Sequence, residues 1–228
     1  RPNFSKVVYN GLNQDFQQGN QSRARVELTR SLGLDLGEGY ILHVGGNQFY
    51  KNRKGVITIY CKWREMGKGH LPLLMVGAVP SKELLYIKEN SPFSNDIYFL
   101  TSISDEMLRI IYNGASVLLF PSLEEGFGWP IAEGLASGCP VITIDKPPMN
   151  EVGGEVCFYL PEPPPVDQME NWLEKAAVTL NEVVNMPECK RKAFRQQAGQ
   201  YAQRFNSLAS LDSIERIYLD ILKSYQLK

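Results

Sequence analysis

Short apolar runs alternate with amphipathic stretches over the first two thirds of the chain. The apolar runs are rich in β-branched side chains and lie at about residues 6–9, 40–44, 72–76, 96–100, 116–120 and 140–144. Stretches with the apolar spacing of a helix lie between them, at about 22–32, 53–66, 81–90, 104–113 and 130–137. The first set predicts β-strands, and the second set predicts the α-helices that separate them.

The alternation of strands and helices indicates the class of fold. Strands joined by helical segments of this length form right-handed crossovers, which build a mostly parallel sheet with helices on both faces. The runs 72–76 and 116–120 are apolar almost throughout, as expected for a sheet that is covered on both sides. We therefore expect an α/β fold, with a Rossmann-like, doubly wound parallel sheet followed by C-terminal helices.

A change in composition near residue 160 marks the end of the predicted core. Proline is frequent over residues 161–166 and suits neither a sheet ladder nor a helix interior, so this segment is predicted to form a loop. We expect a single domain over residues 1–228, with its core at about 5–160. Helical segments follow the loop, at about 167–184, 188–204 and 207–225.

The last of these helices carries a stripe of large apolar side chains. Its members are Leu208, Leu211, Ile214, Ile217, Tyr218, Ile221 and Leu222. Such a stripe is typical of a helix that packs on the rest of its own domain. We therefore expect this face of the helix to be buried.

Charge and cysteine content exclude several classes of protein. The chain has 24 basic and 25 acidic residues and a net charge of -1, so it lacks the basic excess with which proteins bind nucleic acid. Its apolar runs are far shorter than the roughly 18–20 residues that span a bilayer. The cysteines are too far apart for a C-x-x-C pair, at positions 61, 139, 157 and 189. We expect a reduced, cytoplasmic protein without a transmembrane segment.

Several known site motifs do not fit this sequence. The dinucleotide pattern G-x-G-x-x-G begins at Gly126 but meets Ile131 in place of its third glycine, and the P-loop pattern is absent. A nucleophile elbow fails because Ser137 stands one residue too late. His43, expected to be hydrogen-bonded within a strand, and His70, in a loop, supply neither a metal site nor a catalytic triad. A metal-chelating D-x-D pair is also lacking.

The loop that leads into the predicted helix 130–137 has the composition of a ligand site. It follows the carboxyl end of a strand, where parallel sheets bind their ligands. Gly126 and Gly128 allow close backbone approach and leave N–H groups at a helix N-terminus for hydroxyls or phosphate. Glu125 and Glu133 flank these donors with carboxylates, which suits a sugar. Glu124 has no partner at the same spacing, and we expect it to be solvated.

The run from Glu125 to Glu133 resembles the E-x7-E signature of the retaining, nucleotide-sugar-dependent group 1 glycosyltransferases, of family-4 type, which have the GT-B fold. Further segments resemble motifs of that family in the same order along the chain. They are the turn at 10–13, the glycine loop and lysine at 44–52, the strand end at 74–77, Pro121-Ser122, and the runs 136–142 and 150–154. Together they cover nearly the whole chain, which is similar to the C-terminal, donor-binding domain of such an enzyme.

The resemblance implies a role for each matching residue. Glu133 would accept hydrogen bonds from the vicinal hydroxyls of the nucleotide ribose, and Glu125 would contact the donor sugar near its reacting carbon. Lys51 would face the diphosphate, which makes Lys51 and Glu125 the expected catalytic residues. The expected substrate-binding residues are Glu133, Gly126, Phe127, Gly128, Trp129, Gly46 and Asn47.

One departure from the family pattern affects the diphosphate site. The family commonly carries an arginine about five residues before the lysine, in a stretch where this chain has Gly46 and Asn47. Either Lys51 acts alone, or Arg53 or Lys54 substitutes, or donor binding is weakened. As residues at the start of a helix, Arg53 and Lys54 are expected to be solvated.

The family's active site lies in the cleft between two Rossmann-like domains, and this chain resembles only the second. The resemblance implies that an N-terminal, acceptor-binding domain completes the site, makes any peripheral membrane contact, and is needed for activity. The enzyme would transfer a hexose from a UDP-, GDP- or ADP-linked donor to a glycan, lipid or other acceptor, as in polysaccharide biosynthesis. It would need neither a metal ion nor a further cofactor.

Two other functions stay open. The absent arginine also suits a nucleotide-sugar-binding or scaffolding module that keeps the fold without turnover. An unrelated doubly wound enzyme, such as a sugar-phosphate epimerase or isomerase, would need a reactive acid or base pair that the two histidines do not supply.

Overall fold

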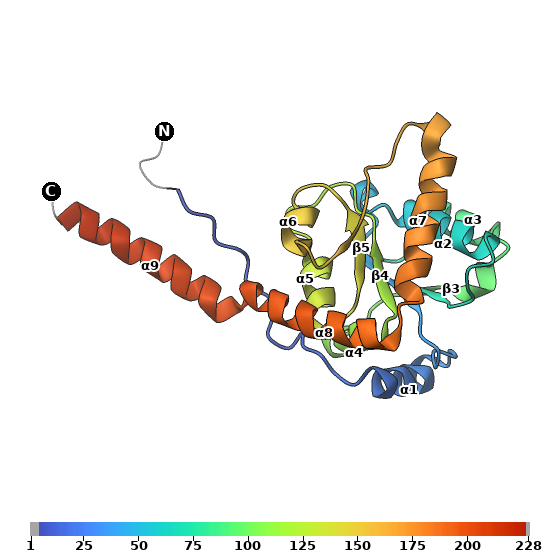
Figure 1. Ribbon diagram of the computed structural model, residues 1–228, viewed down its shortest axis with the longest axis horizontal. Helices are drawn as coiled ribbons and strands as arrows, with labels where there is room; N and C mark the ends of the chain where they lie inside the picture. The colour runs from blue at the N-terminus through green and yellow to red at the C-terminus, as the bar shows by residue number, and fades with distance from the viewer. Residues whose placement is uncertain (1–4, 227–228) are drawn as a thin grey trace.

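A six-stranded parallel sheet forms the centre of the computed structural model, which describes residues 5–226 of the predicted domain 1–228 (Figure 1). The strand order is β3-β2-β1-β4-β5-β6. The order reverses between β1 and β4, so the loops that follow these two strands lie next to each other at the carboxyl edge. The strands are β1 (Ile41–Gly45), β2 (Leu73–Gly77), β3 (Ile97–Leu100), β4 (Val117–Phe120), β5 (Val141–Ile144) and β6 (Phe158–Leu160).

Helices join the strands and then continue beyond the sheet. Within the sheet region they are α1 (Gln21–Leu32), α2 (Arg53–Glu65), α3 (Lys82–Glu89), α4 (Asp105–Gly114), α5 (Trp129–Ala136) and α6 (Met149–Gly153). The C-terminal helices are α7 (Met169–Val184), α8 (Glu188–Ala202) and α9 (Ser207–Gln226). Short 3-10 turns are η1 (Phe49–Lys51), η2 (Ser94–Asp96), η3 (Val166–Gln168) and η4 (Gln203–Phe205). Over residues 5–226, none of the helices is both long enough and apolar enough to cross a membrane.

Local sequence explains where several helices begin. Asn20, Ser81 and Ser104 each cap a helix, because the side-chain oxygen accepts a hydrogen bond from the backbone N–H three residues later. The start of α5 is different, with Gly128 in a left-handed conformation at the N-cap and Pro130 in the first turn. The helix boundaries therefore follow from residues that the sequence displays directly.

The helices cover both faces of the sheet, which confirms the doubly wound α/β fold. Right-handed crossovers place α2 and α3, on the way to β3, on one face, and α5 and α6, on the way to β6, on the other. Two C-terminal helices add to these layers, because α7 packs beside α2 and also contacts β4 and β6, while α8 packs on α5. Every residue of β4 and β5 is buried, as their continuous apolar runs predict.

The predicted strand at residues 6–9 is wrong. This segment forms no ladder with the sheet and instead runs beside the junction of α8 and α9. The Tyr9 and Phe205 rings meet edge to face with centres 5.7 Å apart, and the Leu12 N–H donates to the Phe205 carbonyl oxygen at 2.6 Å. Tyr9 therefore packs on Phe205, while Val7 is 76% exposed, so the run joins no sheet.

β6 and α6 have no counterpart in the sequence-based prediction. β6 has three residues and α6 has five. Elements as short as these display too little of the two-residue or 3.6-residue period to be recognised. Their positions depend on the sheet that they extend.

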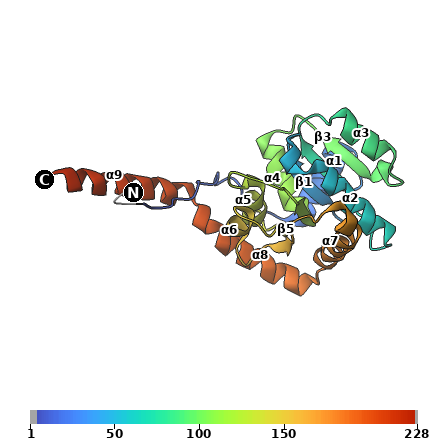
Figure 2. The same ribbon diagram turned by 90° about the horizontal axis from the view of Figure 1, so that it is seen from above.

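α9 leaves the body of the domain instead of packing on it. Figures 1 and 2 show the helix pointing away from the sheet, with the N-terminal segment leaving on the same side. The stripe expected to be buried is exposed over most of its length, with Leu211 at 61% and Tyr218 at 65%. That expectation is wrong, because a helical period reveals an apolar face but not what covers it.

The carboxyl ends of β1 and β2 approach each other so closely that Gly77 cannot be replaced without strain. Gly77 has φ +142°, and a Cβ atom there would lie 2.1 Å from the Gly45 carbonyl oxygen. We expect Gly77→Ala to lower the free energy of unfolding by about 2 kcal/mol or more.

Gly37→Ala is the matched control, because a Cβ atom at that position meets only Asp35 Oδ1, at 3.6 Å. We expect this substitution to change the free energy of unfolding by less than about 1 kcal/mol. Urea unfolding of both variants measures the difference, and equal stabilities would contradict the tight contact between β1 and β2.

Candidate functional site

Two loops meet at the carboxyl edge of the sheet, where β1 and β4 lie side by side. The loop after β1 contains η1, and the loop after β4 leads into α5. The Leu123 N–H and the Ser122 hydroxyl both donate to the Tyr50 carbonyl oxygen, at 2.7 and 2.8 Å. Asn52 Nδ2 donates to the Pro121 carbonyl oxygen at 2.9 Å. These hydrogen bonds make the two loops one structural unit.

Lys51 and Glu125 form an ion pair between the two loops. Lys51 Nζ lies 2.8 Å from each Glu125 carboxylate oxygen, and the two side chains are only 18% and 7% exposed. Ser122 Oγ lies 2.7 Å from Glu125 Oε1, so its single hydroxyl hydrogen is shared between this oxygen and the Tyr50 carbonyl oxygen. Lys51 Nζ also lies 5.5 Å from the centre of the Phe120 ring, whose face attracts a cation. The fold thus brings together two candidate residues that are 74 positions apart.

Asn52 allows Lys51 to stand immediately before a helix. Its backbone is left-handed, with φ +51°, and its Oδ1 accepts a hydrogen bond from the Gly55 N–H as the N-cap of α2. Asparagine adopts this conformation more readily than most residues. The positive end of the α2 dipole therefore lies next to Lys51.

The turn before α5 has backbone N–H groups without a protein acceptor. The hydrogen bonds of residues 5–226 include none donated by the N–H groups of Gly126, Phe127 and Gly128. Gly128 has φ +99° as the N-cap of α5, which glycine adopts without strain. N–H groups at a helix N-terminus bind hydroxyl or phosphate oxygens.

Phe127 and Trp129 belong to an aromatic cluster that anchors this turn. The Phe127 ring meets the Trp129 ring at 5.0 Å and the Phe205 ring at 5.6 Å between centres, both edge to face. Phe205 is fully buried, whereas Trp129 is exposed. The cluster therefore fixes the turn against the C-terminal helices while the Trp129 ring stays accessible.

Glu133 lies one turn into α5 and has one of its two oxygens occupied. The Tyr112 hydroxyl donates to Glu133 Oε2 at 2.7 Å. Oε1 has no protein partner in the described chain and is open to solvent. Burial raises the pKa of the Glu133 carboxyl, the Tyr112 hydrogen bond lowers it, and the charges of Asp105 and Lys51 raise and lower it respectively. The free oxygen is an available acceptor.

Gly46 and Asn47 lie in the loop after β1, but the Asn47 side chain is engaged within the protein. Its Oδ1 accepts a hydrogen bond from Arg53 Nη1, and its Nδ2 donates to the Val79 carbonyl oxygen at 2.6 Å. Arg53 Nη1 also donates to the Ala78 carbonyl oxygen at 3.0 Å. Any contact of Asn47 with a ligand therefore involves its backbone unless this network opens.

The expectation that Arg53 is solvated is wrong. The side chain is 4% exposed, because it spans the loops after β1 and β2 and its guanidinium lies over the Phe99 ring. Its Nε and Nη2 atoms are buried without a hydrogen-bond partner. Lys54 is exposed as expected and pairs with Glu83 at 3.4 Å. Of Arg53 and Lys54, Arg53 is thus the one that adds buried positive charge close to the glycine loop.

An open pocket of about 460 Å³ lies beside Glu125. This volume is in the range of roughly 300–1,000 Å³ typical of small-molecule sites. Glu124, which lines its rim, is exposed as expected. The lining residues are Tyr50, Glu124, Glu125, Gly126, Lys146 and Pro147.

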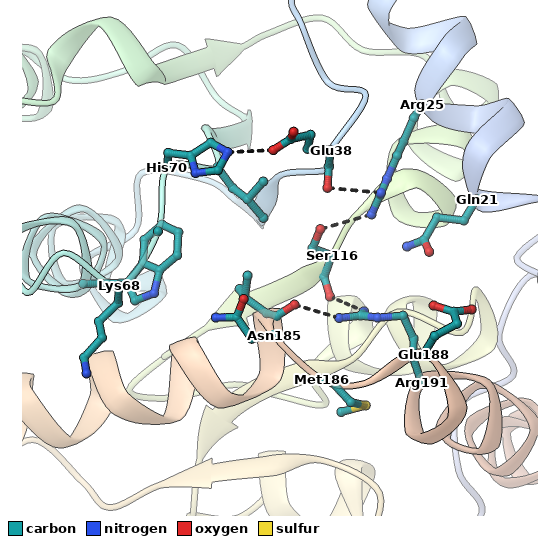
Figure 3. A pocket seen from close by; sticks show the side chains of 14 residues that line it. Gln21, Arg25, Glu38, Lys68, His70, Ser116, Asn185, Met186, Glu188 and Arg191 are labelled. Carbon is teal, nitrogen blue, oxygen red and sulfur yellow. Dashed lines mark hydrogen bonds and ion pairs between the residues drawn. The ribbon is translucent and has the colours of Figure 1, made fainter.

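A pocket of about 360 Å³ lies at the opposite, amino edge of the sheet (Figure 3). The two arginines that line it, Arg25 and Arg191, donate hydrogen bonds to backbone carbonyl oxygens of the fold. Arg25 Nε donates to the Gly114 carbonyl oxygen and Arg191 Nη1 donates to the Ser116 carbonyl oxygen, both at 2.9 Å. These bonds fasten α1 and α8 to the segment that enters β4.

His70 lies away from the candidate site, whereas His43 lies beneath it, with its ring stacked on Phe120 and its Nε2 buried without a hydrogen-bond partner. His43 Nδ1 lies 3.0 Å from the Leu119 carbonyl oxygen, which confirms the expected hydrogen bond. Burial lowers the pKa of His43 to about 4, so its ring is neutral at pH 7. His70 is exposed and contacts Glu38. Residues 5–226 contain no group of three or more histidine, cysteine, aspartate or glutamate side chains arranged to hold a metal ion.

Sequence reasoning missed several groups that shape the site. Tyr112 is the partner of Glu133 from a different helix, and Phe205 anchors Phe127 from the C-terminal part. Neither has a local signal, since both depend on contacts distant in sequence. Ser122 did have one, because it stands three residues before Glu125 in the matched motif.

Comparison with protein families gives one match over most of the core. The family described as "Glycosyl transferases group 1" matches residues 25–172. This span includes both site loops, α5 and all six strands.

Curated relatives are similar over part of their length. The chain is 29% identical to the O-antigen chain mannosyltransferase RfbU of Salmonella typhimurium over 156 residues. This aligned stretch covers 68% of this chain and 39% of RfbU. It is 29% identical over 120 residues to the O-antigen chain mannosyltransferase B of Escherichia coli, covering 52% and 32%. The chain thus spans about two fifths or less of these relatives.

Solved structures share the fold at low sequence identity. Anabaena Alr3699/HepE, in complex with UDP and glucose, has a TM-score of 0.75 at 18% identity, covering 94% of this chain and 57% of that chain. WaaG, a glycosyltransferase involved in lipopolysaccharide biosynthesis, has a TM-score of 0.65 at 20% identity, covering 87% and 52%.

The Lys51–Glu125 pair is expected to contribute more to stability than an exposed pair. Removing one partner leaves a largely buried charge uncompensated, so a double-mutant cycle with Lys51→Met and Glu125→Gln should give a coupling of about 2 kcal/mol or more. The Lys54–Glu83 pair, with side chains 67% and 68% exposed, should give less than about 0.5 kcal/mol. Urea unfolding measures both couplings, and small values at both pairs would contradict the expectation.

Glu133→Gln is expected to stabilise the fold at pH 7. Because the folded-state pKa of Glu133 is raised by burial, its ionised form costs stability above that pKa, and the cost vanishes below the unfolded-state value of about 4.3. The gain in melting temperature should therefore be present at pH 7 and shrink towards pH 4. Glu124→Gln, at an exposed side chain, is the control with little effect at either pH. A pH-independent difference for Glu133→Gln would contradict the assignment.

Proposed function

The chain belongs to the group 1 glycosyltransferases, and we propose that it is the donor-binding part of a retaining enzyme that transfers a hexose from a nucleotide-diphosphate sugar. The Lys51–Glu125 pair carries this proposal, because it lies at the carboxyl edge beside a turn with free N–H donors. A cation, a carboxylate and backbone donors are the groups with which a protein binds a diphosphate and a sugar.

Lys51 would stabilise the leaving diphosphate. Negative charge builds on the diphosphate as its bond to the sugar breaks, and preorganised positive groups lower the energy of that state. Lys51 Nζ supplies a full charge, and the N-terminus of α2 supplies the positive end of a dipole next to it. Held in place by its neighbours, Lys51 needs little reorganisation during transfer.

Donor binding would change the Lys51–Glu125 pair. Without a ligand, both Glu125 oxygens contact Lys51 Nζ. Phosphate oxygens would replace part of this contact and free the Glu125 carboxylate to accept a hydrogen bond from the sugar. Ser122 would keep Glu125 Oε1 in place during the exchange, and the adjoining pocket of about 460 Å³ offers space for a hexose.

Glu133 would bind the ribose of the donor. A carboxylate can accept hydrogen bonds from two vicinal hydroxyls, and Oε1 of Glu133 is free for this contact. Since Gly128 is the N-cap of α5 and Glu133 lies one turn into this helix, the diphosphate and the ribose would lie along its first turns.

Arg53 would support the diphosphate site without replacing the family's arginine in contact with the ligand. Its guanidinium holds Asn47 and the loop after β2 from a buried position. We therefore propose that Arg53 maintains the conformation of the glycine loop and adds positive charge near it. Lys51 is then the cation that contacts the diphosphate.

The relatives favour a particular sugar and acceptor. RfbU and mannosyltransferase B are both named as O-antigen chain mannosyltransferases, which favours a mannose donor and a growing polysaccharide as acceptor. HepE was crystallised with UDP and glucose, so glucose on UDP is the second donor to test. Because this chain spans 39% of RfbU and 57% of HepE, we propose that a preceding domain binds the acceptor.

Calorimetry of the chain with GDP-mannose, UDP-glucose, UDP-N-acetylglucosamine and ADP-glucose tests donor binding. One of these donors should bind, and Lys51→Met and Glu133→Gln should each weaken its binding about tenfold or more, since each removes a charge-assisted contact. Glu124→Gln should bind within about twofold of the unchanged chain. No binding of any donor at millimolar concentration would contradict the proposal.

Transfer by a chain that includes the preceding domain separates an enzyme from a scaffolding module. An enzyme should release the nucleotide and form a glycosidic bond with retained configuration. Donor binding with neither release nor transfer would favour the non-catalytic alternative. This comparison is informative once the donor has been identified by calorimetry.

A further inference from the structure

Tyr112 and Glu133 form a buried contact between two helices that the sequence does not relate. Tyr112 lies in the last turn of α4, has no exposed surface, and donates its hydroxyl hydrogen to Glu133 Oε2 at 2.7 Å. In the described chain this is the only hydrogen bond of either side chain. Each group therefore depends on the other for its partner.

The Tyr112 ring is held in one position by its surroundings. The Phe16 ring packs against it edge to face, with centres 5.8 Å apart. The neighbouring Asn113 fastens the end of α4, because its Nδ2 donates to the Gln17 carbonyl oxygen at 3.1 Å and its Oδ1 accepts from the Gly19 N–H. A ring that is fixed in this way directs its hydroxyl, and hence the carboxylate that accepts from it.

The Glu133 carboxylate has unused acceptor capacity. An ionised carboxylate can accept several hydrogen bonds, and Glu133 accepts one from the protein. A partly buried carboxylate with so few protein partners gains from each further donor, whether water or a ligand supplies it. With Oε2 held by Tyr112, the solvent-open Oε1 is the oxygen that a ligand can reach without displacing a protein contact.

We propose that Tyr112 is a positioning residue of the donor site, which orients the Glu133 carboxylate so that Oε1 receives the vicinal hydroxyls of the donor's ribose. This inference rests on the proposed function, because it requires a ribonucleotide donor at Glu133. Tyr112 itself does not touch the donor. Its contribution is to select one arrangement of the carboxylate before the donor arrives, which reduces the cost of ordering it on binding.

The charged neighbours of Glu133 connect this role to pH. Asp105, at the start of α4, raises the pKa of the Glu133 carboxyl, and Lys51, from the loop after β1, lowers it. The Tyr112 hydrogen bond also lowers it, because the hydroxyl stabilises the ionised form. Loss of the hydroxyl alone should therefore move the titration of Glu133 to higher pH, with Asp105 and Lys51 unchanged.

Tyr112→Phe tests the proposal with the best-binding nucleotide diphosphate and its 2′,3′-dideoxy analogue as probes. The variant should bind the ribonucleotide about tenfold more weakly and the dideoxy analogue within about twofold of the unchanged chain, because the analogue lacks the hydroxyls that Glu133 receives. The pH below which ribonucleotide affinity falls should also move upward. Equal losses for both probes, or an unmoved pH profile, would overturn the proposal.

Tyr60→Phe is the matched control for the loss of a buried hydroxyl. Tyr60 is fully buried on α2, and its hydroxyl donates to the Leu71 carbonyl oxygen at 3.1 Å, towards the amino edge. It should lower the melting temperature without changing either affinity. If Tyr60→Phe lost as much ribonucleotide affinity as Tyr112→Phe, reduced stability of the fold would explain both losses. That result would overturn the proposal.

The double variant Tyr112→Phe/Glu133→Gln completes the cycle. If Tyr112 acts through Glu133, the double variant should bind the ribonucleotide no more weakly than Glu133→Gln alone. Additive losses would overturn the positioning role while leaving the proposed function intact. If the unchanged chain binds no ribonucleotide, or if Glu133→Gln binds it unchanged, the assignment of Glu133 fails and the role of Tyr112 fails with it.

Discussion

The ion pair between Lys51 and Glu125 is the interaction on which the candidate site depends. Two largely buried charges are favourable only when they satisfy each other and their remaining hydrogen bonds are made. Ser122 and the Phe120 ring supply those further contacts. The pair can form only because β1 and β4 are neighbours, so the reversal of strand order brings the two loops together. The site therefore depends on the loop contacts, and the loop contacts depend on the strand order.

Other polar side chains near this edge are also held by residues from another element. Glu133 on α5 is held by Tyr112 on α4, and Asn47 in the first loop is held by Arg53 on α2. Asn47 has both of its side-chain polar atoms engaged within the protein, whereas Glu133 keeps one acceptor oxygen without a protein partner. Glu133 and the turn at Gly128 therefore keep polar groups that the proposed donor would reach without displacing a protein contact, and the Asn47 side chain does not.

Much of the fold and part of the site could be predicted because their signals are local. The apolar runs that become β4 and β5, the cap at Ser104 and the glycines around α5 are readable without any knowledge of neighbours. The errors share one cause. Residues 6–9, Arg53 and the α9 stripe were interpreted from their own periodicity or helix position, whereas their burial depends on elements that are distant in sequence.

The sequence by itself determined the alternation of strands and helices, the E-x7-E run and the family to which it is similar, since these are properties of consecutive residues. The tertiary structure alone decided that Lys51 meets Glu125, that Tyr112 holds Glu133, and that Arg53 is buried. The physical reason is that a hydrogen bond or ion pair requires atoms within about 3 Å. Only the order and packing of the strands and helices bring such atoms together.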